Sequence, residues 1–327
     1  MTLLPDLGTS FRRFHPQHPP PQVPATHADE VTLITAFFDI GRGSWGSGAG
    51  RAFSRSVADY LGYFANLARI RNPMVVFVDE HLAPEVLRLR REAGNEAATI
   101  IYTHPGLLGD AVLAPLTQLI AARMTPALSR FVWRPQAPEY RSPGYVLVNV
   151  LKAPLVCAAI DLGAVEAAQA AWIDFGYCRD GNRFDPAVPW RFDARGRMNL
   201  FHLYPLDERP VFEVVRQGYV YFMGGGIVGP VQCWPAFRRE LDAALRSLTE
   251  CGLIDDDQTL LLMAWRRDPQ GYIVHPVHPS DWFVLLRRFG TAAAPQAVTL
   301  PPRRRRRTPA WLHELGRAIR GPRLPRA

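Results

Sequence analysis

An apolar run ends abruptly in a carboxylate and a glycine at Ala171–Gly176, which reads Ala-Trp-Ile-Asp-Phe-Gly. Buried parallel strands are continuous apolar runs, and open α/β folds bind ligands at the edge where such strands end. Asp174 is therefore predicted to lie at the carboxyl edge of a sheet and to face a phosphate or a metal ion. Protein kinases also contain Asp-Phe-Gly, but this chain lacks the accompanying glycine-rich loop and His-Arg-Asp loop. The sequence therefore excludes a kinase.

A second acid, Asp39, follows an apolar run and precedes Gly41, Arg42 and Gly43. Glycine lets backbone amides approach phosphate oxygens, and a guanidinium can bind them through two hydrogen bonds. This loop is therefore a candidate phosphate site, with Asp39 on a ribose hydroxyl or a base edge. The alternative is a plain strand-to-helix loop. The dinucleotide fingerprint Gly-x-Gly-x-x-Gly is absent, which disfavours a Rossmann dinucleotide site.

Lys152 is the only lysine in a chain that otherwise uses arginine. A compact ammonium is hard to replace by arginine where it meets a phosphate or a carboxylate in a confined place. Lys152 is therefore a candidate site residue. The alternative is a surface lysine that has survived by chance.

The elements that must position these residues alternate along the chain. Strands are predicted at Val31–Phe38, Met74–Val78 and Thr99–Tyr102, with helices at about 54–70 and 84–93 between them. Ser54 or Ser56 is expected to cap the first of these helices, and Asp79 ends the second strand. The β-α-β-α-β order predicts a parallel, doubly wound sheet with right-handed crossovers.

Further elements follow along the chain. A helix at about Asn149–Leu162 is predicted to precede the Trp172 strand, and a strand at Tyr219–Met223 is predicted to end in three glycines. A helix at Pro235–Thr249 is predicted to end at Gly252, because glycine favours the left-handed conformation that closes a helix. The body is expected to be one α/β domain over residues 31–290.

Composition limits the class of protein. The 327 residues can bury a large core, and a hydrophobic fraction of 48% is ordinary for a soluble globular protein. No run approaches the roughly 20 apolar residues of a membrane span, and the first residues lack the pattern of a secretory signal. Four cysteines without metal-ligand spacing indicate reduced thiols. We therefore expect a cytoplasmic protein.

The two ends differ from the body. Residues 1–30 are assigned to a proline-rich leader, and residues 291–327 to a linker and an arginine-rich tail. Residues 303–327 hold nine arginines and one glutamate, a net charge of +8 that equals that of the whole chain. Residues 303–320 are predicted either to lie on an anionic membrane surface as an amphipathic helix or to form a disordered basic tail. Nucleic-acid binding is disfavoured, because no basic and aromatic residues interleave in the body.

Several motifs occur in an order that resembles one family. Together they are similar to the bacterial HtrL/YibB-like family, which itself resembles GT-A glycosyltransferases, and the resemblance covers about residues 31–289. The motifs are Thr35–Gly43, Arg55, Tyr60, Asn72–Phe77, Lys152, Trp172–Gly176, Gly224–Gly226 and Asp257-Gln258.

This resemblance implies a GT-A-like (Rossmann-like) fold, with a mostly parallel central sheet flanked by helices in a single domain. It also implies a glycosyltransferase that moves a sugar from a nucleotide-diphosphate sugar to a cell-surface glycan or glycolipid, of the lipopolysaccharide or capsule type. Lys152 would meet the diphosphate. The full set implied to bind the donor is Thr35, Ala36, Phe37, Asp39, Arg42, Arg55, Asp79, Lys152, Asp174, Gly224, Gly225 and Gly226.

The resemblance also bears on a metal. Asp174 would match the first acid of the DxD pair with which GT-A enzymes hold a divalent ion, but position 176 is glycine. A bound metal would be Mn²⁺ or Mg²⁺ in an oxygen-rich site that bridges the phosphates. His275 or His278 is a candidate for a further ligand. The alternative is a structural histidine in the His-Pro-Val-His-Pro turn.

Three acids, Asp255, Asp256 and Asp257, precede Gln258 at the start of a predicted helix. Acids at this position cap a helix and interact favourably with its dipole. Capping accounts for Asp255 or Asp256. The family pattern implies a catalytic role at the sugar or acceptor for Asp257 and Gln258, beside Lys152.

Three classes of function are consistent with these residues. The first is the glycosyltransferase, placed in the cytoplasm and peripherally at the inner face of the membrane. The second is a catalytically silent GT-A-like protein that binds a nucleotide or glycan and scaffolds polysaccharide assembly, which Gly176 favours. The third, a nucleotidyltransferase or phosphohydrolase, needs clustered metal carboxylates, and the sequence shows Asp174 without a close partner.

Overall fold

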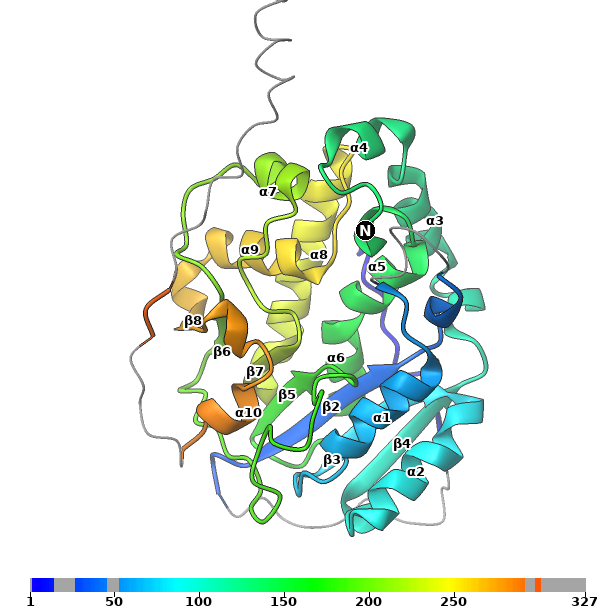
Figure 1. The fold of residues 1–327 in the computed structure, drawn as a ribbon, viewed down its shortest axis with the longest axis vertical. Coiled ribbons are helices and arrows are strands. Elements are labelled where there is room, and N and C mark those ends of the chain that lie inside the picture. Colours follow the sequence, from blue (N-terminus) through cyan, green and yellow to red (C-terminus); the bar gives the residue numbers. More distant parts are fainter. Residues whose placement is uncertain (1, 15–26, 46–52, 292–297, 301–327) are drawn as a thin grey trace, which may run out of the picture.

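The computed structural model describes residues 2–14, 27–45, 53–291 and 298–300. Its centre is a mixed sheet in the order β1-β4-β3-β2-β5-β7-β6-β8 (Figure 1). The four parallel neighbours in this sheet are the strands expected from apolar runs, and they confirm the predicted β-α-β-α-β order. They are β4 (Thr99–His104), β3 (Met74–Asp79), β2 (Val31–Phe37) and β5 (Gln169–Ile173).

The other half of the sheet is mixed. β6 (Met198–His202) and β8 (Tyr272–Pro276) pair in parallel, whereas β7 (Gly226–Pro230) runs antiparallel to both β5 and β6. The short β1 (Arg12–Arg13) pairs antiparallel with β4 at the edge of the sheet. The fold is therefore the expected α/β arrangement, with a mostly parallel central sheet flanked by helices in a single domain.

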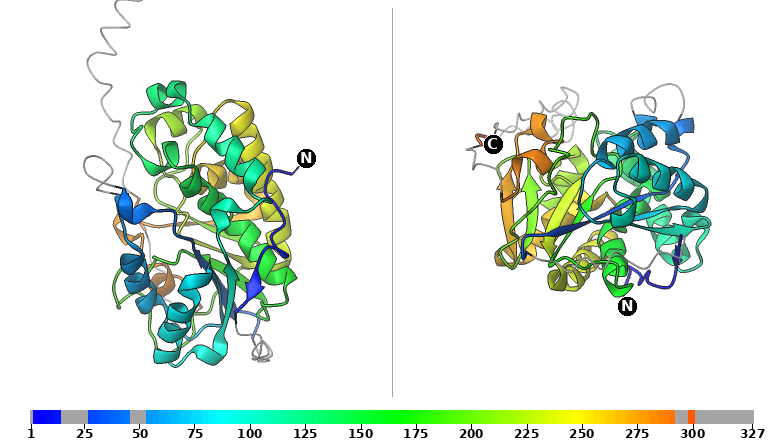
Figure 2. Two further views of the ribbon diagram at one scale, coloured as in Figure 1. Left: turned by 90° about the vertical axis from the view of Figure 1, so that its right-hand side faces the viewer. Right: turned by 90° about the horizontal axis from the view of Figure 1, so that it is seen from below.

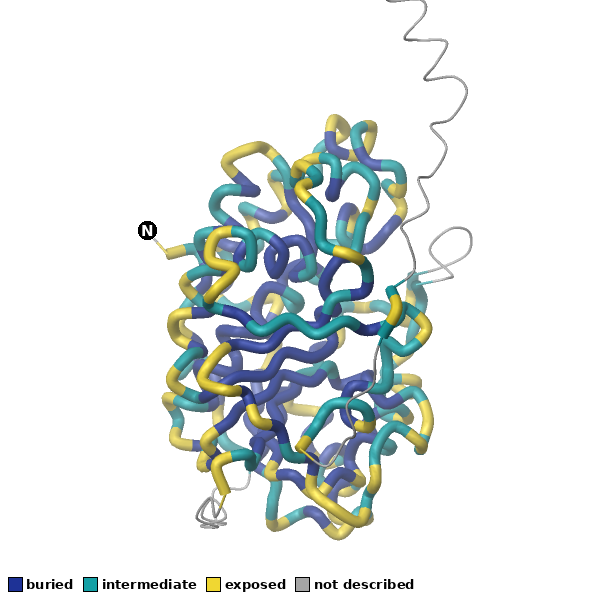
Figure 3. The backbone as a smooth tube through the Cα atoms, turned by 90° about the vertical axis from the view of Figure 1, so that its left-hand side faces the viewer, coloured by how far each residue is buried: buried dark blue, intermediate teal, exposed yellow. Residues whose placement is uncertain are grey.

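Helices cover both faces of the sheet (Figure 2). In β3, Val75 and Phe77 face one layer while Met74, Val76 and Val78 face the other, since successive strand residues point to opposite sides. β3 is therefore buried from end to end, and Figure 3 shows the inner region of the molecule in dark blue. One layer holds α1 (Val57–Leu67), α2 (Ala83–Glu92) and α10 (Leu285–Arg288), and the other holds α3 (Ala114–Arg123), α4 (Pro126–Phe131), α5 (Pro143–Val150), α6 (Lys152–Asp161), α7 (Val211–Gln217), α8 (Trp234–Glu250) and α9 (Asp257–Arg267).

Local signals in the sequence explain where several helices begin and end. Ser56 caps α1 in a reciprocal capping box with Asp59, as one of the two predicted serines. α8 closely matches its predicted range, and Gly252 follows it with a φ of +74°, the left-handed conformation expected there.

Residues 2–14 pack against the body. Leu4 and Leu7 are fully buried, and the ring of Phe11 lies edge-on to that of Phe77 with 4.8 Å between centroids. The Leu4 amide also donates a 2.7 Å hydrogen bond to Asp242 on α8. The core therefore includes side chains that the sequence analysis assigned to the leader. Leader residues 15–26, and the tail with its predicted amphipathic helix at 303–320, lie outside the described residues.

The helix predicted at about Asn149–Leu162 is confirmed for most of its length by α6, but its first two residues belong to a separate helix, α5. α5 ends at Val150 and α6 begins at Lys152, with a bend of 44° between them. Pro154 accounts for the break, since its ring has no N–H and would clash with the carbonyl of Val150 in a continuous helix. Among the described residues no single helix is long and apolar enough to cross a membrane, although this bent pair passes the same test when taken together.

The strand predicted at Tyr219–Met223 is wrong. This segment makes only one isolated bridge, between Phe222 and His202, and the strand β7 begins after it at Gly226. Tyr221, Phe222 and Met223 are buried as expected for an apolar run. The segment lies beside the end of β6, with hydrogen bonds from the Leu203 amide to the Tyr221 carbonyl and from the Met223 amide to the Phe201 carbonyl, but it does not form a continuous ladder. An apolar pattern alone does not distinguish these two arrangements.

Candidate functional site

A cavity of about 390 Å³ lies at the carboxyl ends of β2 and β5. These two strands are parallel neighbours, so the loops that follow them meet at one edge of the sheet. The volume lies in the range of small-molecule sites, which is about 300–1,000 Å³. This is the edge at which the sequence predicted a ligand site.

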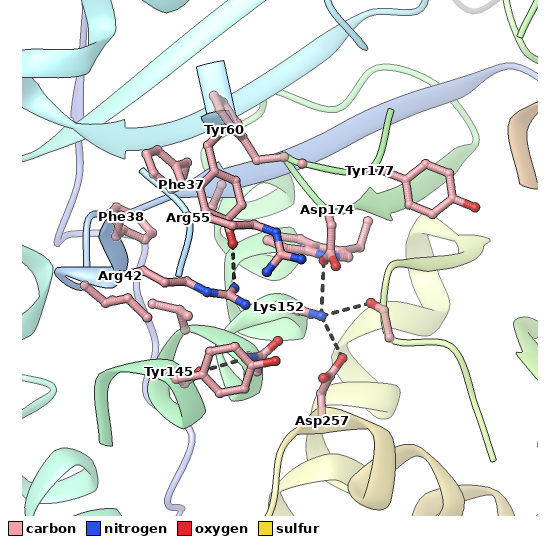
Figure 4. A pocket seen from close by; sticks show the side chains of 18 of the residues that line it. Phe37, Phe38, Arg42, Arg55, Tyr60, Tyr145, Lys152, Asp174, Tyr177 and Asp257 are labelled. Atoms are coloured by element: carbon pink, nitrogen blue, oxygen red, sulfur yellow. Dashed lines mark hydrogen bonds and ion pairs between the residues drawn. The ribbon is translucent and has the colours of Figure 1, made fainter. Parts of the chain in front are cut away.

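Most of the predicted site residues line this cavity, although they come from five separate segments of the chain. Those that line it are Ala36, Phe37, Asp39, Arg42, Arg55, Lys152, Asp174, Gly224, Asp257 and Gln258. Figure 4 shows that Arg42 and Arg55 point toward the space beside Lys152 and Asp174.

Five predicted residues do not line the cavity. Thr35 is fully buried within β2, and within the described residues its hydroxyl has no hydrogen-bond partner. Asp79 ends β3 and accepts a 2.7 Å hydrogen bond from the Asp39 amide, so it supports the loop from behind. Gly225 contributes its carbonyl to the Asp174 amide, and Gly226 begins β7. The fifth is His275, considered next.

The structure does not bring His275 to the cavity. Its Nε2 donates a 2.8 Å hydrogen bond to Oδ1 of Asn199, and its ring stacks on Phe201 at 5.2 Å. Burial lowers the pKa of His275 to about 4, so the ring is neutral at pH 7. These contacts match the structural alternative for this histidine. His278 also lies outside the residues that line the cavity, and its Nδ1 bonds Ser280.

Lys152 lies at the centre of the polar side of the cavity. Its Nζ is 2.8 Å from Oδ2 of Asp257 and 3.1 Å from Oδ1 of Asp174, and it donates a third hydrogen bond of 2.9 Å to the carbonyl of Gly224. An ammonium has three protons, so all three are used within the protein. Burial lowers the pKa of Lys152, but the two carboxylates outweigh burial and raise the pKa above its ordinary value. The lysine is therefore charged at neutral pH.

Two local features place this cluster, which we call the Lys152 cage (Lys152, Asp174, Asp257 and the Gly224 carbonyl). The bend before Pro154 puts Lys152 in the first turn of α6, and Asp257 is the first residue of α9. Gly224 is needed because a Cβ there would lie 2.3 Å from Oδ2 of Asp257. The close approach at Gly224 is therefore to the Asp257 carboxylate.

Two sets of contacts fix the loop after β2: hydrogen bonding to the Asp39 carboxylate, and aromatic side chains around Arg42. Gly41 has a φ of +72°, and its amide donates to Oδ1 of Asp39 at 2.9 Å. Arg42 Nη1 donates to the Tyr60 hydroxyl at 2.5 Å, and its guanidinium lies 5.4 Å from the centroid of the Tyr145 ring. The guanidinium is thereby fixed at the cavity wall, where it can meet an anion.

The structure explains why residue 176 is glycine and not a second acid. A Cβ at Gly176 would lie 3.0 Å from two carbons of the Tyr60 ring, so a longer side chain has no room there. The second carboxylate near Asp174 comes instead from Asp257, which is 83 residues further along the chain. Both acids were candidate site residues from the sequence, but their proximity was not predicted.

Arg179 is a cavity residue that sequence analysis missed. Its guanidinium lies 4.2 Å from the Tyr63 ring centroid and 5.1 Å from that of Phe283, and it lines the cavity together with Arg55. Within the part of the chain that the structure describes, its Nε is buried without a hydrogen-bond partner. A basic residue five positions after Asp174, on the same loop, was the signal that could have found it.

The acids Asp255 and Asp256 support the start of α9 and do not line the cavity. Oδ1 of Asp256 accepts a hydrogen bond from the Gln258 amide as the N-cap, and Oδ2 of Asp255 accepts one from the Thr259 hydroxyl at 2.7 Å. Burial, together with the charge of the nearby Glu139, raises the pKa of Asp255 to about 7. The capping role predicted for these acids is confirmed.

Charge and donor chemistry define what the cavity can bind. Arg42, Arg55 and Arg179 face it, and within the described residues none of the three forms an ion pair. Together with the Lys152 cage and Asp39 they leave the cavity with a net charge of +1, which suits an anionic ligand. A metal site fits less well, since no group of three His, Cys, Asp or Glu side chains in the described residues could hold an ion.

The fold and the cavity thus define an α/β protein with an arginine-lined cavity at the carboxyl edge of its sheet. Residues 29–291 match the family described as "Bacterial protein of unknown function (HtrL_YibB)". The chain is also 32% identical to protein HtrL of Escherichia coli strain K12 over 271 residues, which covers 79% of this chain and 92% of that protein. The chain therefore belongs to the HtrL/YibB family, as its motifs predicted.

Proposed function

We propose that this protein is a glycosyltransferase that takes a sugar from a nucleotide-diphosphate sugar and transfers it to a cell-surface glycan or glycolipid. The observation that supports this proposal most directly is the meeting of three arginines with two cavity acids at the carboxyl edge of the sheet. A diphosphate needs neutralising cations, and a sugar needs carboxylate acceptors for its hydroxyls. The cavity offers both within one space.

The proposed donor pose follows from which groups are free to bind it. The loop with Asp39 and Arg42 would hold the nucleoside, and Arg42, Arg55 and Arg179 would hold the diphosphate. Transfer breaks the bond between the anomeric carbon and the diphosphate oxygen, which keeps the electron pair. The oxygen of the acceptor hydroxyl bonds to that carbon, and the hydroxyl proton passes to the departing diphosphate. The arginines would then stabilise the negative charge that develops on the leaving diphosphate.

The role proposed for Lys152 differs from the one implied by the family resemblance. All three of its protons bond to protein oxygens, so it has none left for a phosphate. We assign it instead to positioning Asp174 and Asp257. Asp257 and Gln258 line the side of the cavity at the start of α9, where they would contact the sugar or the acceptor.

Calorimetric titration with a panel of UDP- and GDP-sugars tests donor binding. Replacing Arg179 with leucine should weaken binding of the best donor about tenfold to a hundredfold, the loss expected for hydrogen bonds to a charged group. The matched control is Arg130→Leu, which removes the same charge from an exposed position on α4. Failure of every donor to bind the wild-type chain, or equal effects of the two substitutions, would count against the proposal.

A second candidate is a catalytically silent protein that binds the same donor or a glycan and scaffolds polysaccharide assembly. The observation that favours it is Gly176, because this position carries no carboxylate where the acid pair of GT-A enzymes has its second member. Donor binding without hydrolysis or transfer, in the presence of acceptor extract, would select this candidate.

Contact with a membrane surface through residues 303–320, at the cytoplasmic face, remains part of the proposal. It rests on the net charge of +8 in the tail and not on any described residue. Co-sedimentation with anionic vesicles, compared between the full chain and one that ends at residue 300, measures this contact. Equal co-sedimentation of the two forms would exclude the tail as the contact.

A further inference from the structure

A divalent cation in this fold would have to sit where the cavity acids converge, and that place is the Lys152 cage. Asp174 reaches it from the end of β5 and Asp257 from the start of α9, while the Gly224 carbonyl supplies a third oxygen. Two carboxylates and a carbonyl are a donor set that hard cations use. Here the three oxygens surround an ammonium.

The distances fit hydrogen bonds and not metal bonds. The oxygens lie 2.8–3.1 Å from Nζ, within the range of charge-assisted hydrogen bonds. Magnesium requires oxygen ligands at about 2.0–2.1 Å. A metal could therefore enter only if the cage contracted and the lysine left it.

The lysine is not free to leave. Its side chain is only 6% exposed, and it starts a helix whose direction is set by the bend before Pro154. A divalent ion beside a retained ammonium would meet strong repulsion at this distance. The residues present therefore do not fit a divalent metal in the cage.

We propose that the ammonium of Lys152 takes the place of the divalent cation, so that this protein binds its donor diphosphate without a metal. This inference rests on the proposed donor-binding function. Lys152 joins the two acids, and neutralisation of the diphosphate is left to Arg42, Arg55 and Arg179.

One consequence concerns the remaining oxygen of Asp174. Oδ1 accepts hydrogen bonds from Trp172 Nε1 at 2.8 Å and from Lys152, whereas Oδ2 makes none within the described residues. The side chain is 42% exposed at the cavity. We therefore assign Asp174 Oδ2 to accept a hydrogen bond from a hydroxyl of the donor and not to ligate a metal.

Binding of Mn²⁺ alone to the full chain, followed by electron paramagnetic resonance, tests this directly and needs no nucleotide. We expect the wild-type chain to show no saturable Mn²⁺ binding at Asp174, so Asp174→Asn should leave the Mn²⁺ signal unchanged. The matched control Asp180→Asn, which alters an exposed acid on the same loop, should also behave like the wild type. Saturable binding of one Mn²⁺ that is lost in Asp174→Asn but kept in Asp180→Asn would overturn the proposal.

The Lys152→Met variant provides the converse test. Without the ammonium, the two carboxylates and the carbonyl are open to a metal, so Mn²⁺ affinity should rise at least tenfold over the wild type. If the Lys152→Met chain folds but gains no Mn²⁺ binding, the proposal that the Lys152 ammonium takes the place of a divalent cation would be overturned. If this variant fails to fold, the comparison of the wild type with Asp174→Asn still decides the question.

Donor titration in EDTA and in Mn²⁺ completes the design. The affinity of the best UDP- or GDP-sugar should change less than twofold between the two conditions, and a tenfold loss in EDTA would overturn metal independence. Absence of donor binding in both conditions would refute the proposed function instead, while the Mn²⁺ measurement would still decide the role of Lys152.

Discussion

Replacement of Lys152 with methionine should destabilise the fold by an amount that depends on pH. The substitution keeps the length of the side chain but removes the cation that offsets the burial of Asp257, whose side chain is 6% exposed. Removal of one partner from a buried ion pair costs about 3–5 kcal/mol. The pair with Asp174 adds little to this figure, because that carboxylate is 42% exposed and screened by solvent. We therefore expect the free energy of unfolding at pH 7 to fall by about 3–5 kcal/mol.

The sign of the pH dependence follows from Asp257. Burial raises the pKa of Asp257 and Lys152 lowers it, so the pKa should rise further in the variant. An acid whose pKa is raised by folding destabilises the protein when it is ionised, and this penalty disappears as pH falls toward its unfolded value. The deficit of Lys152→Met relative to wild type should therefore shrink as pH falls from 7 toward 3.8, the ordinary pKa of an aspartate.

Urea unfolding followed by circular dichroism at pH 7 and pH 5 measures both effects. The double variant Lys152→Met/Asp257→Asn should regain most of the lost stability at pH 7, because it no longer buries an unpaired charge. Arg130→Met, on the surface of α4, should stay within about 0.5 kcal/mol of wild type. A loss below about 1 kcal/mol for Lys152→Met, or an equal loss at both pH values, would refute the assigned role of the cage.

Three further substitutions probe the surroundings of the site. Gly224→Ala places a methyl group 2.3 Å from an Asp257 oxygen. We expect a loss of about 1–3 kcal/mol in urea unfolding and weaker donor binding by calorimetry, so an unchanged donor affinity would speak against the cage. Gly176→Asp restores the missing second acid but crowds the Tyr60 ring at 3.0 Å; donor binding should weaken without becoming Mn²⁺-dependent, and a gain in Mn²⁺-dependent affinity would contradict this. Arg90→Met removes hydrogen bonds to three backbone carbonyls in the core. It should cost about 3 kcal/mol or more in unfolding experiments while donor affinity stays within twofold, and a changed affinity would show that the residue acts on the site.

The strands that carry the site were predictable because burial on both faces leaves long apolar runs. β2, β3 and β5 each form such a run, and the acids that follow them mark the carboxyl edge. Asp39 and Asp174 could therefore be placed at one edge from sequence alone. The parallel pairing of β2 with β5 makes that edge a shared one.

The pairings across the site were not predictable from sequence. Lys152 and Asp257 are separated by 105 positions, and nothing in local spacing shows that one ammonium reaches both acids. Pro154 was visible in the sequence as a signal for a helix break, but the long apolar pattern around it favoured a continuous helix. The reasons for glycine at positions 176 and 224, the Tyr60 ring and the Asp257 carboxylate, are visible only in the structure.

The segment Tyr219–Met223 shows the opposite error. Aromatic and apolar residues favour strands because they fit a half-buried pleated surface, and this preference depends on context. Here Tyr221, Phe222 and Met223 are buried beside the end of β6 with one isolated bridge, and the strand β7 begins only at Gly226. The apolar pattern thus indicated burial correctly, but it did not indicate that the ladder is interrupted here.

The packing of residues 2–14 against the body limits how far the chain can be shortened at its N-terminal end without exposing the core. β1 pairs with the outer edge of β4, while Leu4 and Leu7 occupy the core beside α8. A chain trimmed to residues 29–291, the span that matches the family, would leave that edge uncovered and a hollow in the interior. Uncovered edge strands invite pairing between molecules and hence aggregation. The limits of family similarity and the limits of the folding unit are therefore different in this protein.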